Sequence, residues 1–305
     1  MGTKGAVVRG IVTGGSGFLG SHVAEFLVER GHHITVVDSA PTSKHEYVCA
    51  DLLDPAMLTS AFRGQDFVCH LAAVGDVYLA MEKPALAAAV NVTGSANVCE
   101  AALAAGVKRV VVASTWEVYG EPHYQPIDEA HPCSPDHPYN ITKLAGERVA
   151  IAYARFKKLP VLALRLGTAY GTRMRPNAVF TIFARRALEK QPIVLQGGGT
   201  QGRQFTHASD IAAAFAAALE RGQPGEAYNV VGDEFITIRE LAEVVVRLAP
   251  TELTVGEARP GDVPSARVSN ERAKHELGWR AMKPFVQGVE EIVAEQQRQL
   301  TSASA

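Results

Sequence analysis

Short β-branched runs alternate with helical patterns through the first half of the chain, and this alternation constrains the fold more than any other feature. Between the first two runs, Leu19, Val23 and Phe26 recur at the spacing of one helix face. Strands that alternate with helices predict a parallel sheet with right-handed crossovers and helices on both faces. We therefore expect an α/β fold with a doubly wound parallel sheet. The runs are GIVTGG, HITVVDS, YVCAD, FVCHLAA, RVVVAST and VLALRLG.

The pattern loosens after about Thr168, where loop-rich segments such as YGTRMRPN and QGGGTQGRQ begin. Order returns in AYNVVG, which is typical of a further strand. We expect a larger lobe and a smaller, interleaved C-terminal lobe. The larger lobe is predicted to comprise residues 1–169 together with 210–235, and the smaller lobe residues 170–209 and 236–305.

Composition and charge exclude several classes of function. The 305 residues carry a formal net charge of −2, so no basic field attracts nucleic acid or anionic lipid. No apolar run approaches membrane length, and the glycine-containing start does not resemble a signal peptide. The four cysteines show no CxxC spacing, and no His, Cys, Asp and Glu residues stand at metal-ligand spacing. We expect a cytoplasmic protein that binds no metal, nucleic acid or membrane.

A glycine-rich turn follows the first predicted strand. Gly14, Gly17 and Gly20 stand at G-x-x-G-x-x-G spacing in VTGGSGFLG, where the first helix begins. Glycines let the backbone approach a pyrophosphate, and the free N–H groups of a helix N-terminus attract it. Asp38 ends the second strand, where a carboxylate accepts hydrogen bonds from a ribose diol and repels a 2′-phosphate.

These features predict that the larger lobe is a Rossmann-type domain that binds NAD rather than NADP. Asp51, at the end of the third strand, is expected near the adenine. The smaller lobe is then expected to bind the substrate. The predicted cofactor contacts in this part of the chain are Gly14, Gly17, Phe18, Leu19, Gly20, Asp38, Asp51 and Leu52.

Two segments supply the groups of an acid–base relay. YNITK places Tyr139 and Lys143 four residues apart, on one face of a predicted helix. A phenol has an unperturbed pKa of about 10, so a tyrosine base needs a nearby cation, which Lys143 supplies. Thr115, in STWEVYG at the end of an apolar strand, is expected to steady a substrate hydroxyl. The set suits hydride transfer from a secondary alcohol to NAD.

With these motifs the chain resembles the extended short-chain dehydrogenase/reductases, the nucleotide-sugar epimerase/dehydratase family, over essentially its whole length. The resemblance implies that Ala72 and Ala73 line the NAD cleft and that Asn91 supports the cofactor. It also implies that Tyr139 is the base and that Lys143 holds the nicotinamide ribose. The matching segments are GGSGFLG, HLAA, NVTGS, STWEVYG, YNITK, LRLGTAYG, GRQFTHASD and RPGD.

The same resemblance implies how the substrate is held. Thr115 would bond the sugar 4-hydroxyl, while Arg203 and Arg259 would grip the nucleotide diphosphate, which suits a guanidinium fork. The expected substrate is a nucleotide sugar, with a UDP-sugar preferred to a dTDP-sugar. A homodimer is also implied, formed by the helices after EKP and through YNITK.

The reaction depends on the two residues after Thr115. In family members that dehydrate a sugar, STDEVYG supplies an Asp that protonates the departing C6 oxygen and a Glu that takes the C5 proton. This chain has Trp116 in place of the Asp, and an indole N–H cannot serve as a proton-transfer acid. Ordinary dehydration is therefore disfavoured, although Glu117 is retained. Trp116 either shields the sugar from water or packs beneath the loop.

A second departure bears on the substrate. Where many hexose epimerases have RYFNVYG, this chain has RLGTAYG, with Thr168 at the Asn position and Arg175 seven residues later. This pair resembles the uronate 4-epimerases, in which it meets a C6 carboxylate. An ionised Glu117 beside that carboxylate would be a like-charge conflict, so the two features disagree.

Three functions remain open. The first is an NAD-dependent 4-epimerase that transiently oxidises C4 of a UDP-hexose, with UDP-glucuronate among the candidates. The second is a Glu117-dependent decarboxylase, C5-epimerase or dehydratase of a UDP- or dTDP-sugar. The third, a protein that binds NAD and a partner without turnover, is disfavoured by the complete relay. The predicted catalytic residues are Thr115, Glu117, Tyr139 and Lys143, and the predicted substrate-binding residues are Ser114, Trp116, Thr168, Arg175, Arg203 and Arg259.

Overall fold

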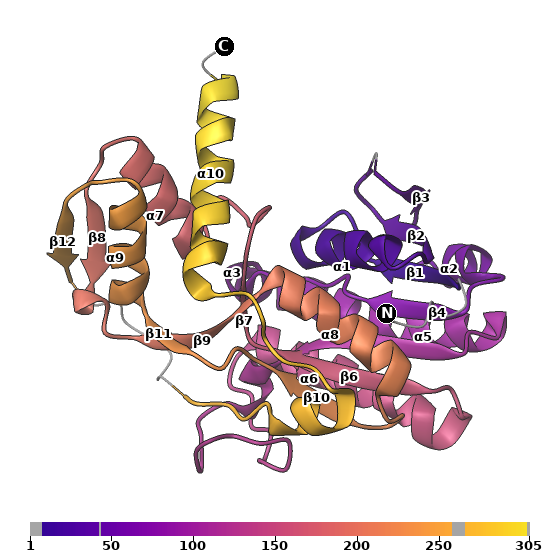
Figure 1. Ribbon diagram of the computed structural model, residues 1–305. Coiled ribbons are helices and arrows are strands. Elements are labelled where there is room, and N and C mark those ends of the chain that lie inside the picture. Colours follow the sequence, from indigo (N-terminus) through magenta and orange to yellow (C-terminus); the bar gives the residue numbers. More distant parts are fainter. Residues whose placement is uncertain (1–7, 43, 258–265, 304–305) are drawn as a thin grey trace.

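The structure, a computed structural model, describes residues 8–42, 44–257 and 266–303, which form two lobes (Figure 1). In the larger lobe, seven described strands form a parallel sheet with the order β10-β6-β5-β4-β1-β2-β3. The expected doubly wound parallel sheet is confirmed. The strands are β1 (Arg9–Thr13), β2 (His33–Asp38), β3 (Glu46–Cys49), β4 (Phe67–His70), β5 (Arg109–Thr115), β6 (Val161–Leu166) and β10 (Ala227–Val230).

Helices cover both faces of this sheet because successive strand residues point to opposite sides. Val12 of β1 belongs to the same buried cluster as Leu27 of the first helix, whereas its neighbour Ile11 belongs to a cluster with Phe62 on the opposite face. One face is covered by α1 (Phe18–Glu29) and α8 (Ala208–Arg221), and the other by α2 (Pro55–Phe62), α5 (Gly94–Ala105) and α6 (Pro138–Ala152).

The smaller lobe packs helices against two small sheets. Its core combines aliphatic side chains with an aromatic group that includes Tyr170, Phe180, Phe205 and Phe285. The described strands of this lobe pair in the orders β11-β9-β7 and β12-β8. These elements are β7 (Thr168–Tyr170), β8 (Ile193–Gln196), β9 (Gly202–His207), β11 (Phe235–Thr237), β12 (Leu253–Gly256), α7 (Val179–Leu188), α9 (Ile238–Leu248) and α10 (Phe285–Ala303).

One segment between β12 and α10 of the smaller lobe returns to the larger lobe. Ala273, Leu277 and Trp279 are buried in the cluster that contains α8, and Trp279 Nε1 donates a 2.8 Å hydrogen bond to the Asp210 carbonyl. The division expected from the sequence does not include this return, because the π-helical turn η5 (Ala273–Leu277) is too short to show periodicity.

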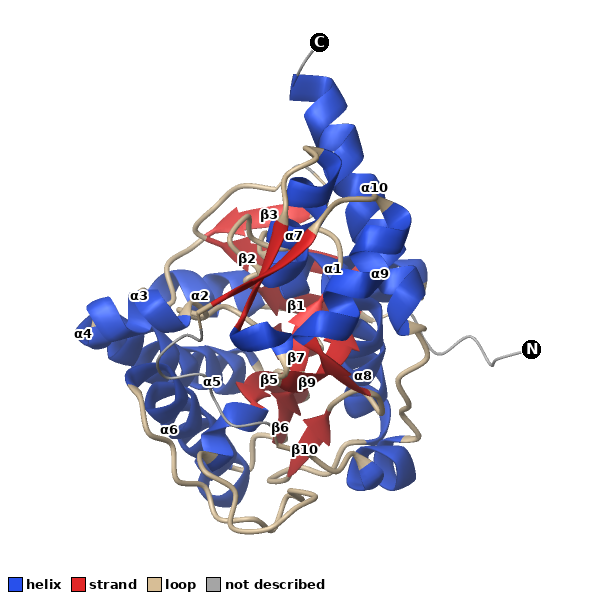
Figure 2. Ribbon diagram, turned by 90° about the vertical axis from the view of Figure 1, so that its left-hand side faces the viewer, coloured by secondary structure: helices blue, strands red, loops and turns tan. Residues whose placement is uncertain are grey.

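Short helices border the site. Beside α6 run α3 (Val77–Glu82), α4 (Pro84–Ala88) and the π-helical η1 (Ala89–Thr93), which leads into α5 (Figure 2). The 3₁₀ turn η2 (Trp116–Tyr119) follows β5 directly. Within the described ranges, no helix is long and apolar enough to cross a membrane.

Candidate functional site

A cleft of about 1030 Å³ lies between the two lobes. Its walls come from the C-terminal ends of the larger-lobe strands, from residues 173–180 and from Phe205. Strand β1 lies between β2 and β4, so the strand order reverses at this point. Open α/β sheets bind ligands in the crevice outside the strand ends at such a reversal.

The glycine turn forms a close-packed floor at one end of the cleft. Gly14 has a φ of 72°, and a Cβ on it would lie 2.6 Å from the Ala72 nitrogen. A Cβ on Gly20 would lie 2.1 Å from the Gly14 carbonyl oxygen. Gly17 precedes α1 without a side-chain cap, and the first turn of α1 carries no acidic residue. The first amides of α1 thus remain available to an anionic ligand, and the turn fits a pyrophosphate.

Asp38 lines the cleft and also holds the turn in place. Its Oδ2 accepts a 3.0 Å hydrogen bond from the Ser16 nitrogen, and its Oδ1 accepts one of 3.0 Å from the Ala40 nitrogen. Each carboxylate oxygen keeps further acceptor capacity, which fits the predicted ribose diol. Asp51 and Leu52 line the same end of the cleft, together with Phe18 and Leu19.

Asn91 lies behind the cleft wall rather than among its lining residues. Its buried Oδ1 accepts a 2.8 Å hydrogen bond from the Val74 nitrogen, and its Nδ2 donates to Thr142 Oγ1 at 3.0 Å. Asn91 therefore ties the loop after β4 to α6, so its support of the predicted cofactor is indirect. Ala72 and Ala73 do line the cleft.

The predicted acid–base groups meet in the middle of the cleft. Lys143 Nζ donates a 2.7 Å hydrogen bond to the Ala113 carbonyl, and burial lowers the pKa of Lys143 to about 8. Burial raises the pKa of the Tyr139 phenol, and the charge of Glu117 raises it further. A hydrogen bond with Thr115 and the charge of Arg175 lower it. Lys143, the cation expected from the sequence to lower this pKa, is not among these causes.

Glu117 lies half-buried on η2, near the phenol. Burial raises the pKa of its carboxyl, whereas His137 and Arg203 lower this pKa. Thr115 Oγ1 accepts a 3.3 Å hydrogen bond from the Glu117 nitrogen and so begins the turn. Glu117 is therefore a carboxyl that can exchange a proton nearer to neutral pH than an exposed glutamate.

Trp116 lies both in the apolar packing beneath the loop and in the wall of the cleft. It is 6% exposed and packs in an apolar cluster with Val118, Ile127, Val231 and Val268. It also lines the cleft. Trp116 therefore packs in the apolar cluster of the loop and is also part of the cleft wall.

Ser114 lines the cleft but directs its hydroxyl into a buried polar network. Its Oγ donates a 2.6 Å hydrogen bond to Glu147 Oε2, and Glu147 Oε1 lies 2.6 Å from Arg165 Nη2. Arg165 also donates to the Tyr119 hydroxyl at 2.8 Å. This network was not predicted from the sequence, because Glu147 and Arg165 lie in different elements.

The residues predicted to bind the sugar and the diphosphate do not all line the cleft. Thr168 and Arg175 line the cleft, and an Arg175 nitrogen forms an ion pair with Asp76. Arg203, on β9, donates a 2.8 Å hydrogen bond to the Gly202 carbonyl and lies near Glu117. Arg259 lies outside the described residues.

Asp76 is a lining residue that the sequence analysis did not identify. The available signal was an Asp directly before the helical pattern VYLAME, which is typical of a helix N-cap. Among the residues that the structure describes, no group of three or more His, Cys, Asp and Glu side chains could hold a metal ion.

The sequence matches a family model described as "NAD dependent epimerase/dehydratase family" over residues 11–231. The chain is 31% identical over 306 residues to the UDP-glucose 4-epimerase of Mycolicibacterium smegmatis, covering 94% of this chain and 97% of the relative. It is 34% identical over 258 residues to the UDP-N-acetyl-alpha-D-glucosaminuronate decarboxylase of Bacillus cytotoxicus, with 79% and 80% covered. It is 30% identical over 310 residues to the dTDP-D-glucose 4,6-dehydratase of Mus musculus, with 93% and 87% covered.

Solved structures extend the likeness to the whole fold. The UDP-glucose 4-epimerase of Thermotoga maritima, with UDP-glucose, has a TM-score of 0.90 and 28% identity, with 96% of this chain and 99% of that chain covered. MoeE5, in complex with UDP-glucuronic acid and NAD, has a TM-score of 0.87 and 30% identity, with 95% and 99% covered. The expected cofactor is therefore confirmed as NAD, and the glycine turn and Asp38 fit it.

Proposed function

The chain belongs to the NAD-dependent epimerase/dehydratase family, and we propose that it is a nucleotide-sugar 4-epimerase that transiently oxidises C4 of a UDP-hexose. One observation carries this proposal: Thr115, Tyr139 and Lys143 line one cleft, with an indole instead of an acid at position 116. UDP is preferred to dTDP because the similar 4-epimerases are named for UDP-glucose, whereas the similar dTDP-glucose enzyme is a dehydratase.

Tyr139 is the group that exchanges a proton with the C4 oxygen in this proposal. Burial keeps the phenol protonated in the free protein, and Thr115 and Arg175 stabilise the phenolate once it forms. Lys143 uses one of its three N–H donors on the Ala113 carbonyl and retains two for the cofactor ribose. NAD, when bound, supplies the hydride acceptor and a positive charge that favours the phenolate.

A second candidate rests on Glu117. A carboxyl whose pKa is raised by burial, close to the reacting phenol, can take and return a proton during decarboxylation, C5 epimerisation or dehydration. The similarity to a uronate decarboxylase and to a 4,6-dehydratase is compatible with each of these reactions on a UDP- or dTDP-sugar.

One experiment separates the two candidates. The NAD-loaded protein is incubated with UDP- and dTDP-sugars, and the products are followed by NMR and mass spectrometry. A 4-epimerase gives a C4 epimer of unchanged mass. Loss of water or carbon dioxide, or inversion at C5, would assign the Glu117-dependent reaction instead. Absence of any product from every sugar would exclude both.

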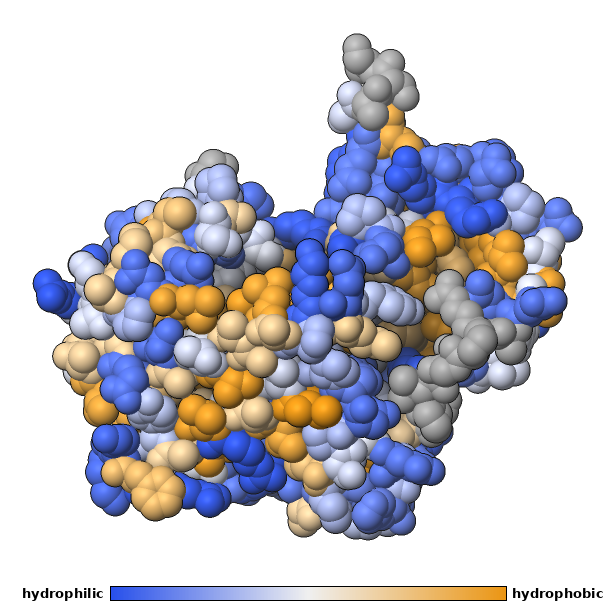
Figure 3. Space-filling view, turned by 180° about the vertical axis from the view of Figure 1, so that it is seen from behind, coloured by the Kyte–Doolittle hydropathy of each residue, from blue (hydrophilic) through white to orange (hydrophobic). Residues whose placement is uncertain are grey.

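We also propose a homodimer formed through α4, α5 and α6. Apolar side chains gather over the larger lobe on this face (Figure 3), and Leu86, Leu103 and Ile141 are exposed there. Leu86→Lys with Ile141→Lys should give a monomer in light scattering, whereas Val255→Lys, on β12, should not. A monomeric parent protein would contradict the proposal. The cytoplasmic location stays a prediction.

A further inference from the structure

Two charged side chains meet across the cleft. Asp76 comes from the loop of the larger lobe before α3, and Arg175 from the segment between β7 and α7. Asp76 Oδ2 and Arg175 Nη1 form an ion pair, and both residues line the cleft. The two residues are 99 positions apart in the sequence, so the fold alone brings them together.

We propose that Asp76 determines substrate selectivity at C6, because its carboxylate pairs with the Arg175 guanidinium, the group that the resemblance to uronate 4-epimerases assigns to a C6 carboxylate. The substrate class that the cleft accepts is then a UDP-hexose with an uncharged C6 group, and a uronate is rejected. This inference rests on the proposed function and specifies its substrate.

The Asp76 carboxylate is held in position by its own helix. Its Oδ1 accepts a 3.0 Å hydrogen bond from the Leu79 nitrogen and caps α3, while Oδ2 pairs with Arg175. The Asn177 side chain also donates to this carboxylate. The cap and the charge of Arg175 both lower the pKa of Asp76, so the carboxylate is ionised at neutral pH. An ionised carboxylate therefore faces the guanidinium of Arg175, whose side chain is itself 52% exposed.

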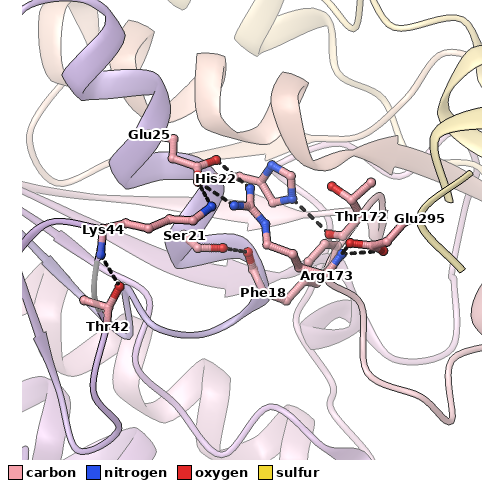
Figure 4. A network of polar contacts seen from close by, with 9 residues as sticks. All are labelled: Phe18, Ser21, His22, Glu25, Thr42, Lys44, Thr172, Arg173 and Glu295. Carbon is pink, nitrogen blue, oxygen red and sulfur yellow. Dashed lines mark hydrogen bonds and ion pairs between the residues drawn. The ribbon is translucent and has the colours of Figure 1, made fainter. Parts of the chain in front are cut away.

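The segment that carries Arg175 is anchored as well (Figure 4). Arg173 donates from both terminal nitrogens to the two carboxylate oxygens of Glu25 on α1, at 2.6 and 2.7 Å. Its backbone nitrogen donates to both oxygens of Glu295 on α10, each at 3.0 Å. These contacts fix the backbone two residues before Arg175, so the guanidinium is kept within reach of Asp76.

The pair also lies beside the reacting group. Arg175 lines the same cleft as Tyr139 and Glu117. Its charge lowers the pKa of the Tyr139 phenol, whereas the charge of Glu117 raises it. A C6 carboxylate would compete with Asp76 for Arg175 and would also meet Glu117. Juxtaposed like charges are unfavourable and so act against binding of a wrong ligand.

Asp76→Asn tests the proposal. Asn is as good an N-cap as Asp, so α3 should persist, while the negative charge facing Arg175 is lost. The matched control is Asp54→Asn, because Asp54 caps α2 in the same way and lies outside the cleft lining. Binding of UDP-glucose and UDP-glucuronate to the NAD-loaded proteins is measured by calorimetry.

The parent protein should bind UDP-glucuronate more weakly than UDP-glucose. Asp76→Asn should shift the ratio of the two affinities towards UDP-glucuronate by about tenfold or more, and Asp54→Asn should not shift it. Asp76→Ser, also a good N-cap, should give the same shift if Asp76→Asn does not fold. An unchanged ratio, or a parent that prefers UDP-glucuronate, would overturn the proposal. Since binding needs no turnover, sugars that bind without being epimerised would refute only the proposed function.

Discussion

Lys143 Nζ donates a hydrogen bond to the Ala113 carbonyl at the end of β5, within a cleft that lowers the pKa of this amine to about 8. The ordinary value is 10.5, and burial is the main cause of the difference. The fold thus holds the amine at a buried position, where its charged form is destabilised. A position of this kind is expected where function rather than stability selects the residue.

Lys143→Met should leave the fold as stable as the parent or more stable, while turnover falls by about a hundredfold or more. In the parent, the unfolded chain binds more protons between pH 8 and 10.5, so stability should rise with pH across that window. Thermal unfolding at several pH values measures the stability of the variant and the pH dependence in the parent. Steady-state kinetics measures the loss of turnover. Lys108→Met is the control, because Lys108 is exposed on the surface. A clear loss of stability in Lys143→Met would assign a structural role to the amine.

Tyr139→Phe should lower kcat by about 10²–10⁴-fold and leave folding and NAD binding nearly intact, because only a hydroxyl is lost. Tyr153→Phe is the matched control, since its hydroxyl donates to Glu100 outside the cleft lining. Steady-state kinetics and NAD titration are the measurements. If Tyr139→Phe kept more than about a tenth of kcat, the base would be another residue.

Asp38→Arg should weaken NAD binding and improve NADP binding, because the charge near the ribose 2′ position reverses. Asp38→Asn should change the preference less, since an amide keeps one acceptor for the Ser16 or Ala40 nitrogen that Asp38 now holds. Fluorescence titration with both cofactors measures the effect. Equal NAD affinity in the parent and the Arg variant would remove Asp38 from the ribose site.

The buried ion pair beneath the cleft gives a test of stability. Arg165 and Glu147 are almost fully buried, and Arg165→Met leaves the carboxylate without its partner. The free energy of unfolding should fall by about 3–5 kcal/mol, measured in urea, and Arg165→Met combined with Glu147→Leu should recover most of it. If the double variant were no more stable than the single one, an unpaired charge would not be the cause.

Sequence patterns were sufficient for the parts of the site that lie within one element. The glycine turn opens α1, and Tyr139 and Lys143 share a face of α6, so spacing alone places these residues. The parallel sheet then brings the turn and α6 to the same cleft, because the ends of parallel strands meet at one edge.

Pairs that join distant elements could not be predicted in this way. Nothing in the sequence around Arg175 indicates that its partner is Asp76, and a helix N-cap explains that Asp without any second role. The Glu147–Arg165 pair is hidden for the same reason: Arg165 is a charged residue within the apolar strand VLALRL, but nothing in the sequence identifies Glu147 as its partner. Local patterns report the neighbours along one element, whereas such pairs depend on how the elements pack.

Trp116 occupies the position where an acid would help a C6 hydroxyl to depart. Trp116 lines the cleft and belongs to the apolar cluster that contains Ile127 and Val268. At this place an indole can exclude water from a sugar ring while it supports the loop. We predict that Trp116 protects a 4-keto intermediate from elimination. Trp116→Asp, incubated with a neutral UDP- or dTDP-hexose, should give a trace of 4-keto-6-deoxy product that the parent does not form, detected by mass spectrometry as loss of water.

The apolar cluster makes this substitution costly, because a carboxyl there loses its hydration. Burial also raises the pKa of a carboxyl, however, and an acid that holds its proton at neutral pH is the group that elimination requires. Trp116→Phe is the control, since it keeps an aromatic ring in the cluster and adds no acid. Circular dichroism and NAD binding establish that the variants fold. A folded, NAD-bound Trp116→Asp variant with the rate and products of the parent would show that position 116 does not face C6.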